Sequence, residues 1–192
     1  MRRFCGWLML ALALAGCGAE GDRFAGVDLT GASWGKDFHL RDPEGRVRSL
    51  ADFRGKVVAV FFGFVQCPDA CPTALARAVE AKKKLGANGD RLQVIFITVD
   101  PERDSAELLR EYIAAFDPTF LALRGTPEEV RRVADEFKVF YEKVPTGSAY
   151  TVNHSTMTYL FDPQGRLRVG LSHALGAEQF AHDVRLLLKQ AS

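Results

Sequence analysis

The stretch VVAVFFGFVQCPDACP, at residues 57–72, decides the fold that the sequence predicts. Residues 57–64 are apolar throughout and rich in β-formers, which is typical of a strand buried on both faces of a parallel sheet. A second run of this kind, LQVIFITV, covers residues 92–99. Residues 72–85 between them are rich in alanine and lysine and have a proline in the first turn, so we expect a helix. Together these segments predict a βαβ unit with a right-handed crossover.

Shorter elements surround this unit. Two short strands, at residues 37–40 and 46–50, flank an Asp-Pro-Glu-Gly turn and predict an N-terminal hairpin. The rest of the chain predicts a helix at residues 104–116 capped by Asp104, a strand at 120–123 and a helix at 126–137 capped by Thr126. A loop at 139–153, a hairpin of strands 157–161 and 167–171, and a closing helix at 177–189 follow. This order fits an α/β, thioredoxin-like fold with an N-terminal β-hairpin and an inserted helix, although periodicity alone leaves several α/β folds open.

The composition is that of a globular protein of ordinary size. The chain has 192 residues, of which 47% are hydrophobic and 26% charged. A chain of this length forms one domain with a real core. The formal net charge is +1, which is far from the basic excess of nucleic-acid binders. We therefore expect no nucleic-acid partner.

The first residues predict an export signal and not part of the fold. Arg2 and Arg3 form a positive segment, and the apolar run at residues 4–15 has the length of a signal-peptide core but is too short to span a bilayer stably. The run ends in LAGC, which resembles the lipobox of bacterial lipoproteins. That resemblance implies cleavage before Cys17 and a diacylglycerol on its thiol. The alternatives are a plain secretory signal or an uncleaved anchor, with Cys17 incidental.

The sequence is thus divided into a lipoprotein signal peptide at residues 1–16, a tether at residues 17–34 and a thioredoxin-like domain at residues 35–192. The tether consists largely of glycine, alanine and small polar residues. The lipid would anchor the protein to a membrane, so we expect it in the cell envelope, on the periplasmic or extracytoplasmic side.

Cys67 and Cys71 follow the first buried strand, at the end of a parallel sheet where ligands bind. So close a pair in an exported protein is a disulfide, a metal site or each in turn. A purely structural disulfide is a poor explanation, because so short a loop removes little entropy from the unfolded chain. Cys71 falls at the start of a helix, whose dipole favours a thiolate and predicts a lowered pKa. Two thiolates suit Cu(I), whereas Cu(II) prefers an added imidazole.

His154 is the candidate imidazole. It lies in VNHST at residues 152–156, just before a predicted strand. In thioredoxin folds this loop faces the cysteines and carries a proline, which is missing here, with Thr156 near its position. The alternative is an ordinary surface histidine, which is how we interpret the remaining three, His39, His173 and His182.

These motifs together resemble the Sco/SenC family. They are F-x-x-x-Q-C-P-D-A-C-P from Phe62, T-V-D-P-E-R-D at residues 98–104 and V-N-H-S-T at residues 152–156. The resemblance covers the chain from about Gly31 onward. One departure is Asn153, where many relatives have an aspartate, and it removes a charge beside the site but no ligand.

The resemblance implies one copper ion, as Cu(I) or Cu(II), bound by Cys67, Cys71 and His154. It also implies a metallochaperone that assists assembly of the copper site of cytochrome c oxidase subunit II. The alternative is a membrane-tethered thiol–disulfide reductase acting on oxidase subunit cysteines, with Cys67 and Cys71 as a redox-active disulfide. The resemblance therefore implies mainly a metal-binding chaperone, and the alternative adds thiol–disulfide oxidoreductase activity. The expected partners are subunit II, a thioredoxin-like reductant and the membrane.

Two further interpretations concern residues near the cysteines. Asp100 and Asp104 are candidates for a partner surface, as the acidic loop of the family is. The simpler alternative is that Asp100 closes a strand and Asp104 caps a helix. A peroxidase of peroxiredoxin type, with Thr73 and Arg77 beside the cysteine, ranks last because no T-x-x-C pattern precedes Cys67.

Overall fold

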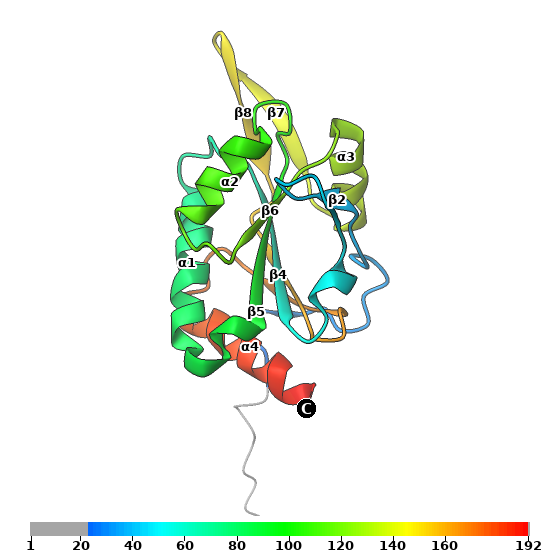
Figure 1. Ribbon diagram of the computed structural model, residues 1–192, viewed down its shortest axis with the longest axis vertical. Helices are drawn as coiled ribbons and strands as arrows, with labels where there is room; N and C mark the ends of the chain where they lie inside the picture. The colour runs from blue at the N-terminus through cyan, green and yellow to red at the C-terminus, as the bar shows by residue number, and fades with distance from the viewer. Residues whose placement is uncertain (1–22, 192) are drawn as a thin grey trace, which may run out of the picture.

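A computed structural model describes residues 23–191 and has a six-stranded mixed sheet at its centre (Figure 1). The strand order is β1-β10-β9-β4-β5-β6. In chain order the strands are β1 Val27–Asp28, β4 Val57–Gly63, β5 Leu92–Thr98, β6 Leu121–Leu123, β9 Thr158–Phe161 and β10 Leu167–Leu171. Strands β4, β5 and β6 are parallel, whereas β9 runs antiparallel to β4. The carboxyl end of β4 therefore lies beside the beginning of β9.

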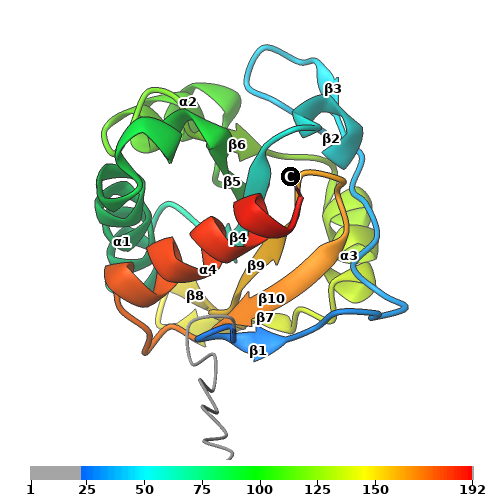
Figure 2. The same ribbon diagram turned by 90° about the horizontal axis from the view of Figure 1, so that it is seen from below.

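Helices cover both faces of this sheet (Figure 2). Side chains of α1, α2 and α4 pack on one face, and those of α3 and the N-terminal segment pack on the other. The helices are α1 Ala70–Lys84, α2 Ala106–Ala114, α3 Pro127–Glu136 and α4 Ala177–Gln190, with short 3-10 turns at Leu50–Phe53 and Gly86–Arg91. Among residues 23–191, no helix is long and apolar enough to cross a membrane.

Strand β4 is buried on both faces, as its apolar sequence predicts. Alternate side chains point to opposite faces of a strand. Val57, Ala59 and Phe61 therefore belong to the core under α1 and α4, while Val58 and Phe62 belong to the core under α3. This double burial fixes the position of the strand that leads into the cysteine loop.

The predicted N-terminal hairpin is present but shorter. It consists of β2 Leu40–Arg41 and β3 Val47–Arg48, which pair antiparallel around the predicted turn. Asp42 is buried and holds this turn, since its carboxylate accepts hydrogen bonds from the backbone N–H groups of Glu44 and Arg46.

The helix starts were predicted correctly at α3 and wrongly at α2. Thr126 caps α3 and forms a capping box with Glu129. At α2 the N-cap is Ser105, whose hydroxyl accepts the N–H of Leu108 at 3.2 Å. Asp104 is not the cap. Its carboxylate is turned inward and buried, so it has no contact with the free N–H groups of the helix.

The segment at residues 139–153, predicted to be a loop, is a second hairpin. Strands β7 Tyr141–Thr146 and β8 Ala149–His154 pair antiparallel, with Tyr141 opposite His154. Both strands are largely exposed and lack a clear apolar alternation, and Pro145 argues against a strand. The signal that could have identified the hairpin is Gly147, whose φ of 65° suits a two-residue turn.

The predicted tether extends too far along the chain. Strand β1 pairs with β10, Val27 opposite Gly170, and the N–H groups of Ala25 and Gly26 donate to the Asp183 carboxylate at 2.7 and 2.9 Å. Residues from 23 onward are therefore part of the domain and not a linker. A two-residue edge strand among glycines leaves little trace in a sequence pattern. The predicted signal peptide and Cys17 lie outside the described residues.

Candidate metal centre

Cys67 and Cys71 lie in the turn that joins β4 to α1. The backbone N–H of Cys67 donates to the carbonyl of Phe64 at 3.2 Å, which closes the turn. The N–H of Cys71, in the first turn of α1, donates to Cys67 Sγ at 3.4 Å. Both thiols are free; Cys67 is half-buried and Cys71 is buried. The turn therefore holds both sulfurs on the same side of the helix start.

His154 approaches the cysteines from the end of β8. Its Nε2 lies 3.6 Å from Cys71 Sγ, and its Nδ1 lies 2.9 Å from the carbonyl of Ser155. That carbonyl accepts a hydrogen bond from Nδ1–H, so the lone pair of Nε2 faces the sulfur. The rings of Phe61 and Phe64 pack edge-on against the imidazole, with centroids 6.2 and 5.8 Å away.

The three donor atoms have the spacing that a small metal ion requires. The sulfurs of Cys67 and Cys71 and a ring nitrogen of His154 all lie within 4.8 Å of one another. Metal–sulfur and metal–nitrogen bonds of about 2.3 and 2.0 Å place donor atoms about 3.5–4 Å apart. No other cluster of three metal-ligating residues occurs in the part of the chain that the structure describes. Soft sulfur together with imidazole is a donor set that fits copper.

Burial changes the protonation of two of these groups. The pKa of the Cys71 thiol is raised, mainly because burial penalises the thiolate. The prediction of a lowered pKa for Cys71 is therefore wrong, because burial of the thiol raises that pKa. Burial also lowers the pKa of His154, which keeps its imidazole neutral and able to bind a metal.

Metal affinity should consequently rise with pH. Because the pKa of Cys71 is raised, the thiol keeps its proton near neutrality, and a bound metal must displace that proton. Each released proton increases the apparent affinity by about tenfold per pH unit below that pKa. Competition titrations between pH 6 and pH 9 measure this slope. A flat profile would contradict a buried, protonated Cys71.

Gly63 leaves room for the buried thiol. A Cβ at this position would lie 2.6 Å from Cys71 Sγ and 2.8 Å from Phe96 Cε2, both closer than atoms can pack. Gly63 ends β4 directly before the cysteine turn. Any larger residue must therefore displace either the sulfur or the core ring.

Gly63→Ala should accordingly weaken metal binding as well as the fold. Overpacking a core of this kind costs about 1–3 kcal/mol of the free energy of unfolding. Gly26→Ala is a matched control, because its Cβ would clash at 2.6 Å with the buried side chain of Val169 on β10, away from the cysteine turn. Thermal unfolding should show that both variants are destabilised, and metal titration should show weakened binding only for Gly63→Ala. Equal affinities in the two variants would contradict a steric role for Gly63.

The two aspartates near the site have internal partners. Asp100 is buried and accepts hydrogen bonds from Arg103 and from the hydroxyl of Tyr150. Asp104 is also buried and accepts from Thr98 Oγ1 at 2.6 Å and from a backbone N–H of the cysteine loop. Burial raises the pKa of Asp104. Both side chains therefore shape the loop from within, and a role in a partner surface stays a prediction.

Two of the other candidates, Arg77 and His182, have partners outside the cluster. The guanidinium of Arg77 donates to the carbonyls of Ser172, His173 and Leu175, so it anchors the loop after β10. An arginine engaged in this way is a poor fit to the peroxidase interpretation. His182 bonds the carbonyl of Arg23.

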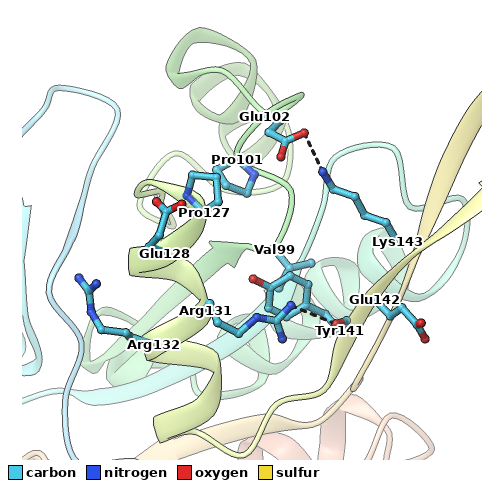
Figure 3. Close-up of a pocket in the computed structure, with 10 residues that line it drawn as sticks. All are labelled: Val99, Pro101, Glu102, Pro127, Glu128, Arg131, Arg132, Tyr141, Glu142 and Lys143. Carbon is cyan, nitrogen blue, oxygen red and sulfur yellow. Dashed lines mark hydrogen bonds and ion pairs between the residues drawn. The ribbon is translucent and has the colours of Figure 1, made fainter.

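A pocket of the described chain lies apart from the cysteines. It has a volume of about 670 Å³ and lies between α3, the loop after β5 and strand β7 (Figure 3). Charged side chains of both signs line it, among them Glu102, Arg131 and Lys143, and none of the three candidate ligands does. It flanks the hairpin that carries His154.

Three residues that support the site were missed by sequence reasoning. Gly63 lies against the Cys71 thiol, Arg103 bonds to the cysteine loop, and Tyr150 bonds to the buried Asp100. A glycine inside an apolar strand is a signal of close approach. Arg103 belongs to a recognised motif, but nothing in the sequence shows what it contacts.

The fold and the site define a class of protein: a thioredoxin-like domain with two thiols and an imidazole gathered at the end of its central strand. The SCO1/SenC family model matches residues 27–189. The chain belongs to the SCO1/SenC family.

Curated relatives agree with this assignment. The mitochondrial SCO2 homologue of Bos taurus is 40% identical over 153 residues, which is 78% of this chain and 58% of the relative. A SCO2-like protein of Rickettsia prowazekii is 40% identical over 135 residues, 69% of this chain and 66% of the relative. The matched part thus spans less than two thirds of the length of these proteins.

Solved structures confirm the fold. Apo Sco1 of Thermus thermophilus has a TM-score of 0.75 and 40% identity, covering 91% of this chain and 99% of its own. Copper-bound ScoI of Bradyrhizobium japonicum has a TM-score of 0.71 and 35% identity, covering 78% and 96%. Copper-bound yeast Sco1 has a TM-score of 0.72 and 34% identity, covering 80% and 87%. The thioredoxin-like prediction is confirmed.

Proposed function

We propose that the protein binds one copper ion through Cys67, Cys71 and His154 and delivers it to the copper site of cytochrome c oxidase subunit II. The observation that carries the proposal is the convergence of the three donor atoms within 4.8 Å. Two relatives of similar fold are copper-bound. The family resemblance supports the oxidase as the destination.

The donor set suits both oxidation states of copper. Two thiolates satisfy Cu(I), and the neutral imidazole of His154 supplies the further donor that Cu(II) prefers. Copper is cargo here and must leave again. Half-buried Cys67, next to the exposed Pro68 and Asp69, is more accessible to an incoming partner than the buried Cys71.

The second candidate function is a thiol–disulfide reductase. Cys67 and Cys71 lie close enough for the N–H of one residue to reach the sulfur of the other. As a pair they could pass two electrons to a disulfide of an oxidase subunit and become a disulfide themselves. A thioredoxin-like reductant would then have to restore both thiols before copper binds again.

The attachment to a membrane is part of the proposal. The sequence LAGC at residues 14–17 supports a lipid on Cys17 and a location in the cell envelope, outside the cytoplasm. Ala25 and Gly26, soon after Cys17 in the sequence, already bond to Asp183 of α4, so the fold would lie close to the membrane surface.

A transfer experiment separates the two functions. Copper-loaded protein is mixed with the reduced, copper-free copper domain of subunit II, and the metal on each partner is measured. A metallochaperone moves copper to subunit II. In the reciprocal mixture, reduced copper-free protein meets the oxidised subunit II domain, and a reductase yields new thiols on subunit II. Reduction of the subunit II disulfide to new thiols, without copper transfer in the first mixture, would overturn the metallochaperone proposal in favour of the reductase.

A further inference from the structure

The guanidinium of Arg103 lies where three segments of the chain meet beside the metal centre. Its Nη1 donates to Gln66 Oε1 at 3.0 Å, one residue before Cys67, and to the carbonyl of Tyr150 at 2.8 Å. Its Nε donates to the buried carboxylate of Asp100. Only 22% of the side chain is exposed. Arg103 therefore joins the cysteine loop, the loop after β5 and the β7–β8 hairpin.

The side chain of Tyr150 is held at two points, by Arg103 at its ring and by Asp100 at its hydroxyl. The Cζ atom of Arg103 lies 3.8 Å from the centre of the Tyr150 ring. The Tyr150 hydroxyl donates to Asp100 Oδ1 at 2.9 Å. A planar guanidinium can stack on a ring and donate in its plane at the same time, which an ammonium cannot do. The contact fixes both the position and the tilt of Tyr150.

Strand β8 links this contact to the metal ligand. Tyr150 and His154 are four residues apart on one strand, so their side chains leave the same face. The ring of Phe64 lies near both ends of the link, 5.9 Å from Arg103 Cζ and 5.8 Å from the His154 ring. A shift of Tyr150 would therefore move the imidazole relative to Cys71 Sγ.

A second tie on the hairpin is weaker. Lys143 Nζ on β7 lies 2.7 Å from a carboxylate oxygen of Glu102 (Figure 3). Both side chains are about half exposed, at 42% and 56%. Ion pairs at such positions contribute little to stability. The partly buried Arg103 contact is therefore the main polar connection between the hairpin and the cysteine loop among the residues that the structure describes.

We propose that Arg103 is a positioning residue of the metal centre. By clamping the β7–β8 hairpin against the cysteine loop, it keeps the imidazole of His154 within reach of the sulfur of Cys71. Arg103 acts through Tyr150 and Gln66 and touches no ligand itself. The proposal rests on the copper-binding function proposed above.

The clamp should matter more for Cu(II) than for Cu(I). Cu(II) needs the imidazole that the hairpin carries, whereas two thiolates of a single loop satisfy Cu(I). Arg103→Gln should lower Cu(II) affinity about 10- to 100-fold, the usual cost of losing a residue that orients a ligand. Cu(I) affinity should stay within about twofold of the wild type. The electronic and electron paramagnetic resonance spectra of bound Cu(II) should change, because the nitrogen ligand is no longer held in place.

Three further variants of the purified full chain complete the test. Arg103→Lys keeps the charge without the planar fork, so it should restore only part of the Cu(II) affinity. Tyr150→Phe removes only the bond to Asp100 and should weaken Cu(II) binding in the same direction, which keeps the test available if Arg103→Gln does not fold. Arg132→Gln, at an exposed residue of α3, is the control and should behave as the wild type. Thermal unfolding is followed for each variant.

The possible outcomes separate the two proposals. Wild-type Cu(II) affinity and spectra in folded Arg103→Gln would overturn the positioning role and leave copper binding intact. Equal losses of Cu(I) and Cu(II) would also overturn it, because they would show a general effect on the fold. If the wild type binds no copper, or if it binds copper without the cysteines, the proposed function itself fails.

Discussion

Replacing either Cys67 or Cys71 with alanine is expected to abolish tight copper binding. Each substitution removes one of two soft donors, and the remaining sulfur and imidazole cannot satisfy Cu(I). The loss of Cu(I) affinity should be larger than the factor of about 10 to 100 that is typical when a residue that only orients a ligand is replaced. Anaerobic competition titration of the reduced protein against a Cu(I) chelator measures it.

The two cysteine variants differ in their effect on stability. Cys71 is fully buried in the core under α1, whereas Cys67 is only half-buried. Cys71→Ala should therefore lower the free energy of unfolding more than Cys67→Ala, while both lose copper. Ala70→Ser, between the two cysteines, is a control that removes no donor. Wild-type copper affinity in either folded cysteine variant would show that the ligands are elsewhere.

His154→Ala should weaken Cu(II) binding far more than Cu(I) binding. The imidazole is the only nitrogen donor in the cluster, and Cu(II) depends on it while two thiolates suffice for Cu(I). Burial keeps the pKa of His154 low, so the ring is neutral and this difference should persist down to mildly acidic pH. Titrations in both oxidation states, with electron paramagnetic resonance of Cu(II), measure the effect.

The control for this prediction is His182→Ala. His182 lies on α4 and bonds the carbonyl of Arg23, away from the cysteines. It should leave both copper affinities unchanged. Equal losses of Cu(I) and Cu(II) in His154→Ala would mean that His154 supports the fold and is not a selective Cu(II) ligand.

The parallel core of the fold could be predicted from sequence because its signals are local. The long apolar runs at β4 and β5 are typical of strands buried on both faces, which lie at the centre of a parallel sheet. The hairpin β7–β8 lacked such a signal, because its strands are exposed and Pro145 interrupts the pattern. Its polar contacts with Arg103 and Glu102 come from the loop after β5, which is distant in sequence.

The three candidate ligands were predicted because a recognisable motif contains each of them, and the structure brings them together. What surrounds them depends on tertiary packing. The helix position of Cys71 suggested a lowered pKa, yet its burial, which no local pattern shows, raises the pKa. Gly63 and Arg103 support the site through contacts that only the folded chain defines.

Copper uptake by the reduced and the oxidised protein tests the central claim most directly. The protein is titrated anaerobically with copper in both states, and alkylation of each cysteine is followed by peptide mass spectrometry. The reduced protein should bind one equivalent, and copper should protect Cys67 and Cys71 from alkylation. The oxidised protein, with these sulfurs joined, should bind no copper tightly until it is reduced. Equal uptake in both states, or full alkylation of both cysteines in the copper-loaded protein, would contradict the account.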